Sequence, residues 1–156
     1  MKDMMSQVRN SKGLCSFSVA VFCLLAIAVS LSGCKEEKDP FTTPGSVENP
    51  NWVVNVDNDM SASMTAIVRV SFTQEVGTLA AFMGDACCGV AEYNTEMGLY
   101  WLYISPATSE GGEVELRFYS PGLKRVFLSR ETFPFRNDTQ LGTVSLPHTP
   151  TWKVAD

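Results

Sequence analysis

The sequence predicts an all-β fold: an immunoglobulin-like antiparallel β-sandwich of about seven to nine strands, preceded by a signal peptide and a flexible tether. Two patterns predict the sandwich. Apolar residues alternate with polar ones along short runs, and turn-forming residues separate those runs. No stretch of ten or more residues has the period of an amphipathic helix. Roughly eight short strands in about 100 residues are typical of a β-sandwich.

Two runs show the alternation most clearly. The residues expected to face the core are Met64, Ala66, Val68, Val70 and Phe72 in the first run, and Val114, Leu116 and Phe118 in the second. Shorter strand-like runs lie at residues 52–56, 79–83, 87–93, 99–104, 124–128 and 143–146. The turn formers between them include Asp57-Asn58-Asp59, Gly84-Asp85, Gly111-Gly112 and Pro121-Gly122.

The first 33 residues have the order of a secretory signal, with basic residues first and then the apolar run 19–31. The run ends in Leu31-Ser32-Gly33-Cys34, which resembles the lipobox of bacterial lipoproteins. This resemblance implies cleavage between Gly33 and Cys34 and attachment of a diacylglyceryl group to the Cys34 thiol. A membrane-spanning helix over residues 14–33 is the alternative, since it would have the required length of about 20 residues. The motif at the end of the run favours the lipoprotein.

Residues 34–51 are expected to form a disordered acidic tether, because they contain few apolar side chains and many polar ones. Such a tether would span about 20–25 Å on average. Its charged run 35–39 resembles the export signal that sends lipoproteins of certain Gram-negative gut and oral anaerobes to the cell surface. The alternative is a solvated linker. The predicted location is the outer membrane, lipid-anchored and surface-exposed, with residues 52–156 as the β-sandwich domain.

Charge and cysteine content exclude several classes of function. After cleavage the chain has nine Lys and Arg against sixteen Asp and Glu, a formal charge of −7. This balance argues against nucleic-acid binding and against electrostatic docking on anionic lipid. Cys87 and Cys88 are adjacent, so their side chains are expected on opposite faces of a strand, one thiol buried and one half-exposed. A redox site is the alternative, but the spacing typical of redox pairs is missing.

Residues 79–91, LAAFMGDACCGVA, resemble the "GAFxGxxCxGVA" signature of small β-sandwich modules in surface and secreted proteins of the same anaerobes. The similarity extends over about residues 52–146, and it departs from the signature at Met83 and Cys88. The resemblance implies the fold and the location. It brings no catalytic residues.

No combination of residues predicts catalysis or a metal site. His148 is the one histidine, without a nucleophile motif, and is expected in a solvent-exposed loop. Asp57 and Asp59 could open a calcium loop, but Ala62 and Val68 stand where its glycine and glutamate belong, so a tight turn is favoured. Glu113 and Glu115 are expected to form a solubilising face. The sequence therefore predicts no enzyme, no metal and no cofactor beyond the lipid on Cys34.

Aromatic residues suggest a binding face. Consecutive strands are often neighbours, so residues 99–104 are expected to pair with 113–119. The outer face would then carry Trp101, Tyr103, Arg117 and Tyr119. These residue types dominate protein–protein hot spots, but aromatic faces with polar neighbours also stack on sugar rings, and cross-strand aromatic pairs can simply stiffen a sheet.

The sequence therefore predicts a non-catalytic binding or assembly module of the cell surface, with a protein partner in the envelope favoured. The alternatives are a glycan-binding accessory protein and a purely structural envelope lipoprotein. Two further tryptophans, Trp52 and Trp152, are expected to cover the two ends of the sandwich.

Overall fold

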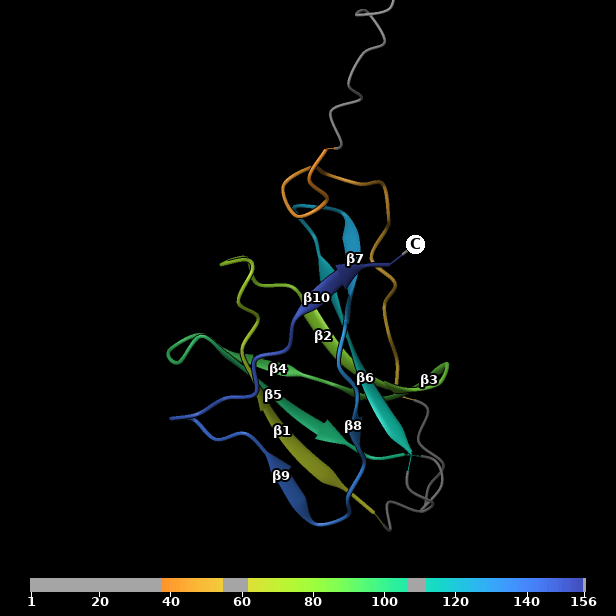
Figure 1. Ribbon diagram of the computed structural model, residues 1–156, viewed down its shortest axis with the longest axis vertical. Helices are drawn as coiled ribbons and strands as arrows, with labels where there is room; N and C mark the ends of the chain where they lie inside the picture. The colour runs from red at the N-terminus through yellow and green to blue at the C-terminus, as the bar shows by residue number, and fades with distance from the viewer. Residues whose placement is uncertain (1–37, 55–61, 107–111, 156) are drawn as a thin grey trace, which may run out of the picture. The chain divides into compact units, whose positions relative to one another are not determined.

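The computed structural model describes residues 38–54, 62–106 and 112–155. In these residues the chain forms ten strands in two sheets and contains no helix (Figure 1). The predicted all-β sandwich is confirmed.

Sheet A has the strand order β4-β5-β1-β9. Its strands are β1 (Met64–Val68), β4 (Glu92–Asn94), β5 (Leu99–Ile104) and β9 (Thr139–Leu141). β1 runs antiparallel to β5 but parallel to β9. The sandwich is therefore not wholly antiparallel, because the long connection from β1 to β9 lets the chain return in the same direction.

Sheet B has the strand order β10-β7-β6-β2-β3, and the short strand β8 also pairs with β6. Its strands are β2 (Thr78–Met83), β3 (Ala86–Val90), β6 (Glu113–Ser120), β7 (Arg125–Ser129), β8 (Phe133–Pro134) and β10 (Trp152–Val154). The pairing of β2 with β3 shifts register between Ala81 and Phe82. Such a shift bends the strand locally.

The core lies between the sheets and is formed by the alternation that the sequence shows. Val114, Leu116 and Phe118 of β6 are fully buried. Opposite them, sheet A buries Leu102 and Ile104 of β5 with no exposed surface. Burying a side chain of this size stabilises the fold by about 1.5–3 kcal/mol.

Two predicted strands have different boundaries. The first run ends as a strand at Val68, yet Val70 remains buried and Phe72 packs on the core without strand pairing. The run 87–93 divides at Ala91, because the chain leaves sheet B after β3 and enters sheet A as β4.

The predicted strand at residues 143–146 is wrong. Thr143 N–H donates to the Leu146 carbonyl, which closes a turn, and Leu146 is 78% exposed. The strands β8, β9 and β10 were not predicted, because they have only two or three residues and no visible alternation. Nor is 52–54 a strand, and the remainder of that predicted run lies outside the described residues.

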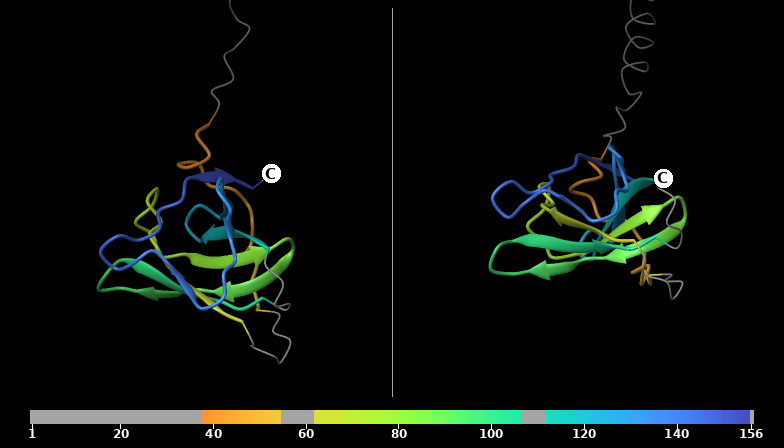
Figure 2. Two further views of the ribbon diagram at one scale, coloured as in Figure 1. Left: turned by 60° about the horizontal axis from the view of Figure 1, so that its bottom comes forward. Right: turned by 90° about the horizontal axis from the view of Figure 1, so that it is seen from below.

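Residues 38–54, here called the strap, pack against the fold instead of forming a disordered tether. Gly45 N–H donates to the Leu123 carbonyl at 2.6 Å, and Val47 N–H donates to the Lys124 carbonyl at 2.9 Å. The Phe41 ring stacks on Phe127 with centroids 5.3 Å apart. The compact unit accordingly begins at Lys38 and includes the strap. In Figures 1 and 2 the strap (orange) starts above the sheets and runs down alongside them.

Candidate functional site

The four residues of the predicted face lie on two different sheets. β5, with Trp101 and Tyr103, pairs with β1 and β4 in sheet A, whereas β6, with Arg117 and Tyr119, lies in sheet B. The predicted pairing of these two strands is wrong. The chain between them is long enough to cross from one sheet to the other, so neighbours in sequence are not neighbours in space.

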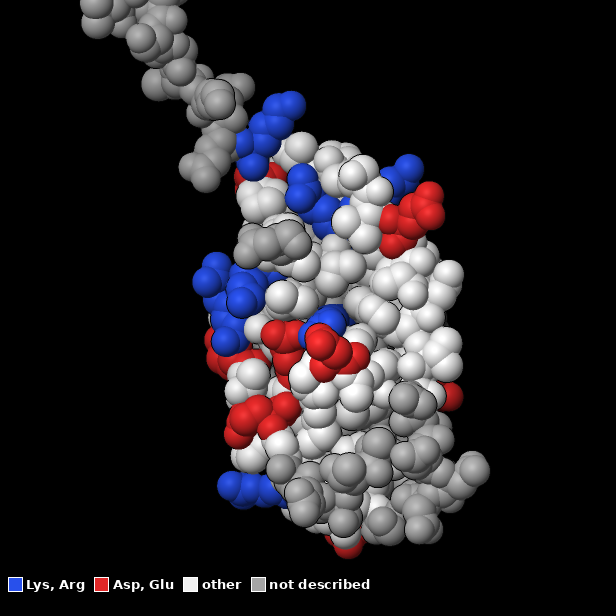
Figure 3. Space-filling view, turned by 90° about the vertical axis from the view of Figure 1, so that its right-hand side faces the viewer, with Lys and Arg blue, Asp and Glu red and all other residues white. Residues whose placement is uncertain are grey.

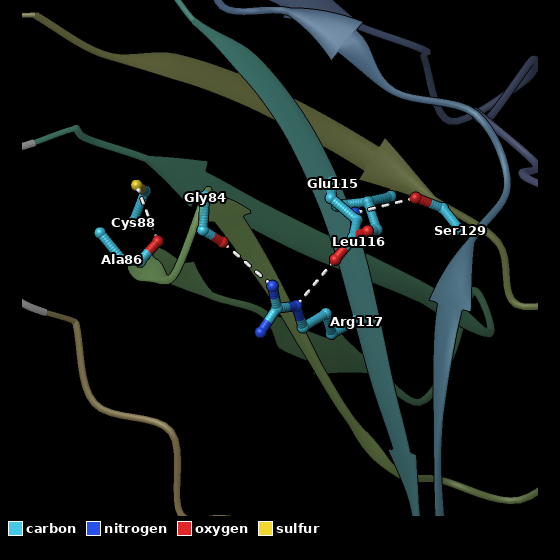
Figure 4. A network of polar contacts seen from close by, with 7 residues as sticks. All are labelled: Gly84, Ala86, Cys88, Glu115, Leu116, Arg117 and Ser129. Carbon is cyan, nitrogen blue, oxygen red and sulfur yellow. Dashed lines mark hydrogen bonds and ion pairs between the residues drawn. The ribbon is translucent and has the colours of Figure 1, made fainter. Parts of the chain in front are cut away.

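Arg117 is held by contacts within the protein (Figure 4). Its Nε donates to Glu115 Oε1 at 2.8 Å, and its terminal nitrogen donates to the Gly84 carbonyl at 3.0 Å. The guanidinium carbon also lies 4.0 Å from the centroid of the Phe82 ring, a cation–π contact. This side chain stabilises the β2–β3 turn and is already engaged.

Tyr119 is covered by the strap. The side chain is only 6% exposed, and its hydroxyl donates to the Val47 carbonyl at 3.3 Å. The outer face of sheet B at Tyr119 is therefore an internal interface of this protein. Tyr119 therefore does not belong to an open binding face, and Arg117 lines a separate hollow of about 540 Å³ together with Val47 and Trp52 of the strap.

Trp101 and Tyr103 point outward as predicted. They are 41% and 51% exposed, while the alternating residues Tyr100, Leu102 and Ile104 are buried. The period of two along β5 places both rings on the same side of sheet A. They are exposed aromatic side chains on a strand in the interior of a sheet.

The strand register supplies polar neighbours for both rings. Trp101 lies opposite Glu92 of β4 on one side and Ile67 of β1 on the other. Tyr103 lies opposite Thr65 of β1, which in turn lies beside Gln140 of β9. We call Glu92, Trp101, Tyr103, Thr65 and Gln140 the aromatic face. It combines two rings with a carboxylate, a hydroxyl and an amide.

A hollow of about 290 Å³ adjoins Trp101 and is lined by Glu92, Tyr93, Asn94 and Trp101. Asn94 Oδ1 accepts a hydrogen bond from Met97 N–H at 3.0 Å. This bond uses the amide oxygen and leaves the NH2 group to donate elsewhere. The hollow therefore has two aromatic residues, Tyr93 and Trp101, and hydrogen-bonding groups of both kinds in its lining.

Sequence reasoning did not identify Glu92 and Asn94 as site residues. Their signal is present, since the two polar side chains flank the half-buried Tyr93. What the sequence could not show is that β4 lies beside β5, because a three-residue strand has too little pattern to identify its partner.

Residue 148 was expected in an exposed loop, and that prediction is wrong. His148 N–H donates to the Ile67 carbonyl, and the His148 carbonyl accepts from Arg69 N–H, both at 2.9 Å. Its ring packs edge-on against Phe133, with centroids 5.7 Å apart. Burial lowers the pKa of His148, and the nearby Glu131 carboxylate partly opposes this shift.

Both thiols of the Cys87-Cys88 pair are free and buried, so the prediction of one half-exposed thiol is wrong. The prediction of opposite faces is correct. Cys88 belongs to the main core, whereas Cys87 packs with Ala80 and Phe82 on the other side of the sheet. Burial raises the pKa of both thiols, which keeps them protonated and weakly nucleophilic.

Several predicted features lie outside the described residues, namely Gly33, Cys34 and the Asp57-Asn58-Asp59 turn. Within the part of the chain that is described, no three His, Cys, Asp or Glu side chains gather as metal ligands would. No helix in residues 38–54, 62–106 and 112–155 has the length and hydrophobicity of a membrane span.

Glu113 accepts a hydrogen bond from Thr132 Oγ1 at 2.8 Å.

The two outlying tryptophans do not both cover the ends of the sandwich. Trp152 of β10 is 5% exposed and belongs to the core, with its ring centroid 5.8 Å from that of Phe72. Trp52 of the strap packs edge-on against Phe82 on the outer side of sheet B, with centroids 5.5 Å apart.

Comparisons of the chain with family models, with curated proteins and with solved structures found no match. The resemblances of residues 31–34 to a lipobox and of residues 79–91 to surface β-sandwich modules therefore stay predictions.

Proposed function

We propose that this protein is a non-catalytic, lipid-anchored module of the bacterial outer membrane that binds a glycan at its cell surface. The observation that carries the proposal is the aromatic face. Trp101 and Tyr103 are exposed side by side on sheet A, with Glu92, Thr65 and Gln140 beside them. Sugar rings stack their C–H groups on such aromatic rings, while their hydroxyls bond to the neighbouring carboxylate and amide.

The four residues of the predicted face lie on two different sheets. This favours a glycan over the protein partner expected from the sequence. Protein hot spots combine Trp, Tyr and Arg in desolvated pockets near the centre of an interface. Here Arg117 and Tyr119 are engaged on the other sheet. The two remaining rings have polar neighbours, and Trp101 also lines a hollow with Glu92 and Asn94. This arrangement suits a small ring with many hydroxyls.

Residues 1–34 support the anchor, because their basic, apolar and Leu31-Ser32-Gly33-Cys34 segments follow in the order of a lipoprotein signal. Two or three acyl chains suffice for stable attachment. The mass of the mature chain, expressed in a Gram-negative host, tests this part. We expect a chain that begins at acylated Cys34, and no acylation of the Cys34→Ala variant. A wild-type chain without acyl groups would overturn the anchor.

The candidate catalytic groups are bonded within the protein or buried, and this supports a non-catalytic role. His148 is bonded to β1 through its backbone, both thiols are buried, and Glu115 is paired with Arg117. None of these groups adjoins the hollow beside Trp101.

Binding of the soluble fragment 38–156 to a panel of polysaccharides tests the glycan site. We expect Trp101→Ala to lose at least about tenfold in affinity, which corresponds to about 1.4 kcal/mol. Trp52→Ala is the matched control, because this tryptophan of the strap packs on the other sheet and its loss leaves the aromatic face intact.

Equal affinity of the wild type and Trp101→Ala would overturn the site. If no glycan binds and an envelope protein binds the wild type but not Trp101→Ala, the ligand class is protein instead.

A further inference from the structure

We infer that the strap holds the fold directly against the bilayer, with the end formed by the turn at residues 39–43 and the β6–β7 turn facing the lipid headgroups. The inference rests on the proposed lipidation of Cys34 and does not depend on which ligand the aromatic face takes. The occupant of this surface is the headgroup layer of the membrane that holds the acyl chains.

The strap is bonded to this end of the fold by backbone and side chain. Arg125 Nε donates to the Thr43 carbonyl at 2.9 Å, and Gly45 N–H donates to the Leu123 carbonyl at 2.6 Å. The turn itself is closed by Thr42 and Thr43 N–H groups, which both donate to the Asp39 carbonyl. The first part of the strap is therefore fixed beside the β6–β7 turn.

An aromatic anchor holds the strap in place. The Phe41 ring contacts Phe127 and Phe72, with both centroid distances 5.3 Å. Phe41 thereby joins the edge of the main core. A segment with backbone hydrogen bonds and a ring in the core moves with the fold rather than acting as a loose tether.

The chain between Cys34 and the fold is consequently short. Asp39, where the turn begins, is five residues from Cys34. Five residues reach at most about 18 Å when fully extended. A disordered tether through residue 51 would have reached about 60 Å. The strap end is therefore held within about 18 Å of the lipidated Cys34.

Charge is not what holds this end to the membrane. Lys38 and Lys124 are exposed there, but Asp39 is exposed beside them. Figure 3 shows basic and acidic side chains interspersed over the side of the molecule that faces right in Figure 1. The covalent lipid and the short reach provide the proximity. In Figure 1 strands β1, β4, β5 and β9 of sheet A lie below the first residues of the strap.

Energy transfer to a headgroup-labelled lipid tests this orientation in the lipidated mature chain, reconstituted in neutral phosphatidylcholine vesicles. One donor dye is placed at Pro121→Cys in the β6–β7 turn and another at Arg136→Cys in the β8–β9 connection, with Cys87 and Cys88 replaced by alanine in both. A fold of this size has a radius of gyration of about 13 Å. We expect at least about twofold higher transfer efficiency from position 121 than from position 136.

A matched variant carries twelve Gly and Ser residues inserted between Glu37 and Lys38. It keeps every strap contact but lengthens the link from five to seventeen residues, which raises its mean span from about 12 Å to about 23 Å. We expect transfer from position 121 to fall towards that from position 136.

Equal transfer from the two positions in the uninserted chain, or no fall on insertion, would overturn the inference. The mass of Cys34 is read on the same samples, so a missing anchor is distinguished from a lipidated fold that does not rest on the membrane.

Discussion

The outer faces of the two sheets differ in what covers them. On sheet B, the strap lies over Tyr119 and Phe82, and both aromatic side chains are buried. On sheet A, Trp101 and Tyr103 stay 41% and 51% exposed. All four residues lie on strands, but only one face is open. An outward aromatic residue thus indicates a binding face only when nothing else in the chain packs on it.

The largest effect is expected when the aromatic anchor of the strap is removed. Phe41→Ala deletes the ring that packs on Phe72 and Phe127. Because Phe41 is only partly buried, we expect a loss of about 2–4 kcal/mol in the free energy of unfolding, near the lower end of the range for buried phenylalanine. Urea unfolding of fragment 38–156 measures it. A loss below about 1 kcal/mol would mean that the strap contributes little to the fold.

A smaller effect is expected from the loss of a single hydrogen bond between sheet B and the strap. Tyr119→Phe keeps the ring but removes the hydroxyl that donates to the Val47 carbonyl. We expect a loss of about 0.5–1.5 kcal/mol. Measured in the Phe41→Ala background, the same substitution should cost less, because the strap is then already loosened. Identical costs in both backgrounds would argue that the strap does not move as one unit.

On the open face of sheet A, a substitution is expected to change stability little and ligand affinity strongly. Trp101→Ala should lower the free energy of unfolding by only about 0.5–1 kcal/mol, because the residue is exposed and its losses are cross-strand contacts. Ligand affinity should nevertheless fall strongly. The same urea experiment and a binding isotherm on one sample compare the two effects. A stability loss as large as that of Phe41→Ala would assign Trp101 a structural role.

The smallest effect is expected from pH at the edge of sheet A, where the half-buried His148 lies beside β1. Burial lowers the pKa of His148 in the folded state, so the unfolded chain binds the proton more readily. Stability should therefore decrease as the pH falls below the unfolded pKa of about 6.5. Thermal unfolding between pH 7.5 and 5.5 measures this slope, and His148→Gln should flatten it. Glu131 stays ionised throughout this window, because its pKa is lowered.

Local pattern predicted much of the fold. Residues 99–104 were predicted as a strand with Trp101 and Tyr103 outward, and β5 has these limits and this orientation. The alternation in 113–119 likewise identified the buried side chains of β6. These predictions succeed because a strand with one buried face repeats every two residues, and that period is written in consecutive residues.

The candidate site depended on pairings that the sequence does not contain. Glu92 joins Trp101 only because β4 pairs with β5, and Arg117 leaves the face because β6 lies in the other sheet. The connection between β5 and β6 has no period that distinguishes a hairpin from a crossing between sheets. The pairing of nearest neighbours was therefore the natural expectation, and here it is wrong.

The sequence by itself determined where strands form, which side chains alternate inward, and that the N-terminus has the pattern of a lipoprotein signal. The tertiary structure alone decided which strands are neighbours, that Phe41 anchors the strap, and which aromatic residues remain open. The physical reason is that strand formation depends on neighbours two residues apart. Pairing and covering depend instead on apolar contacts between segments such as residues 41 and 127, which no local pattern encodes.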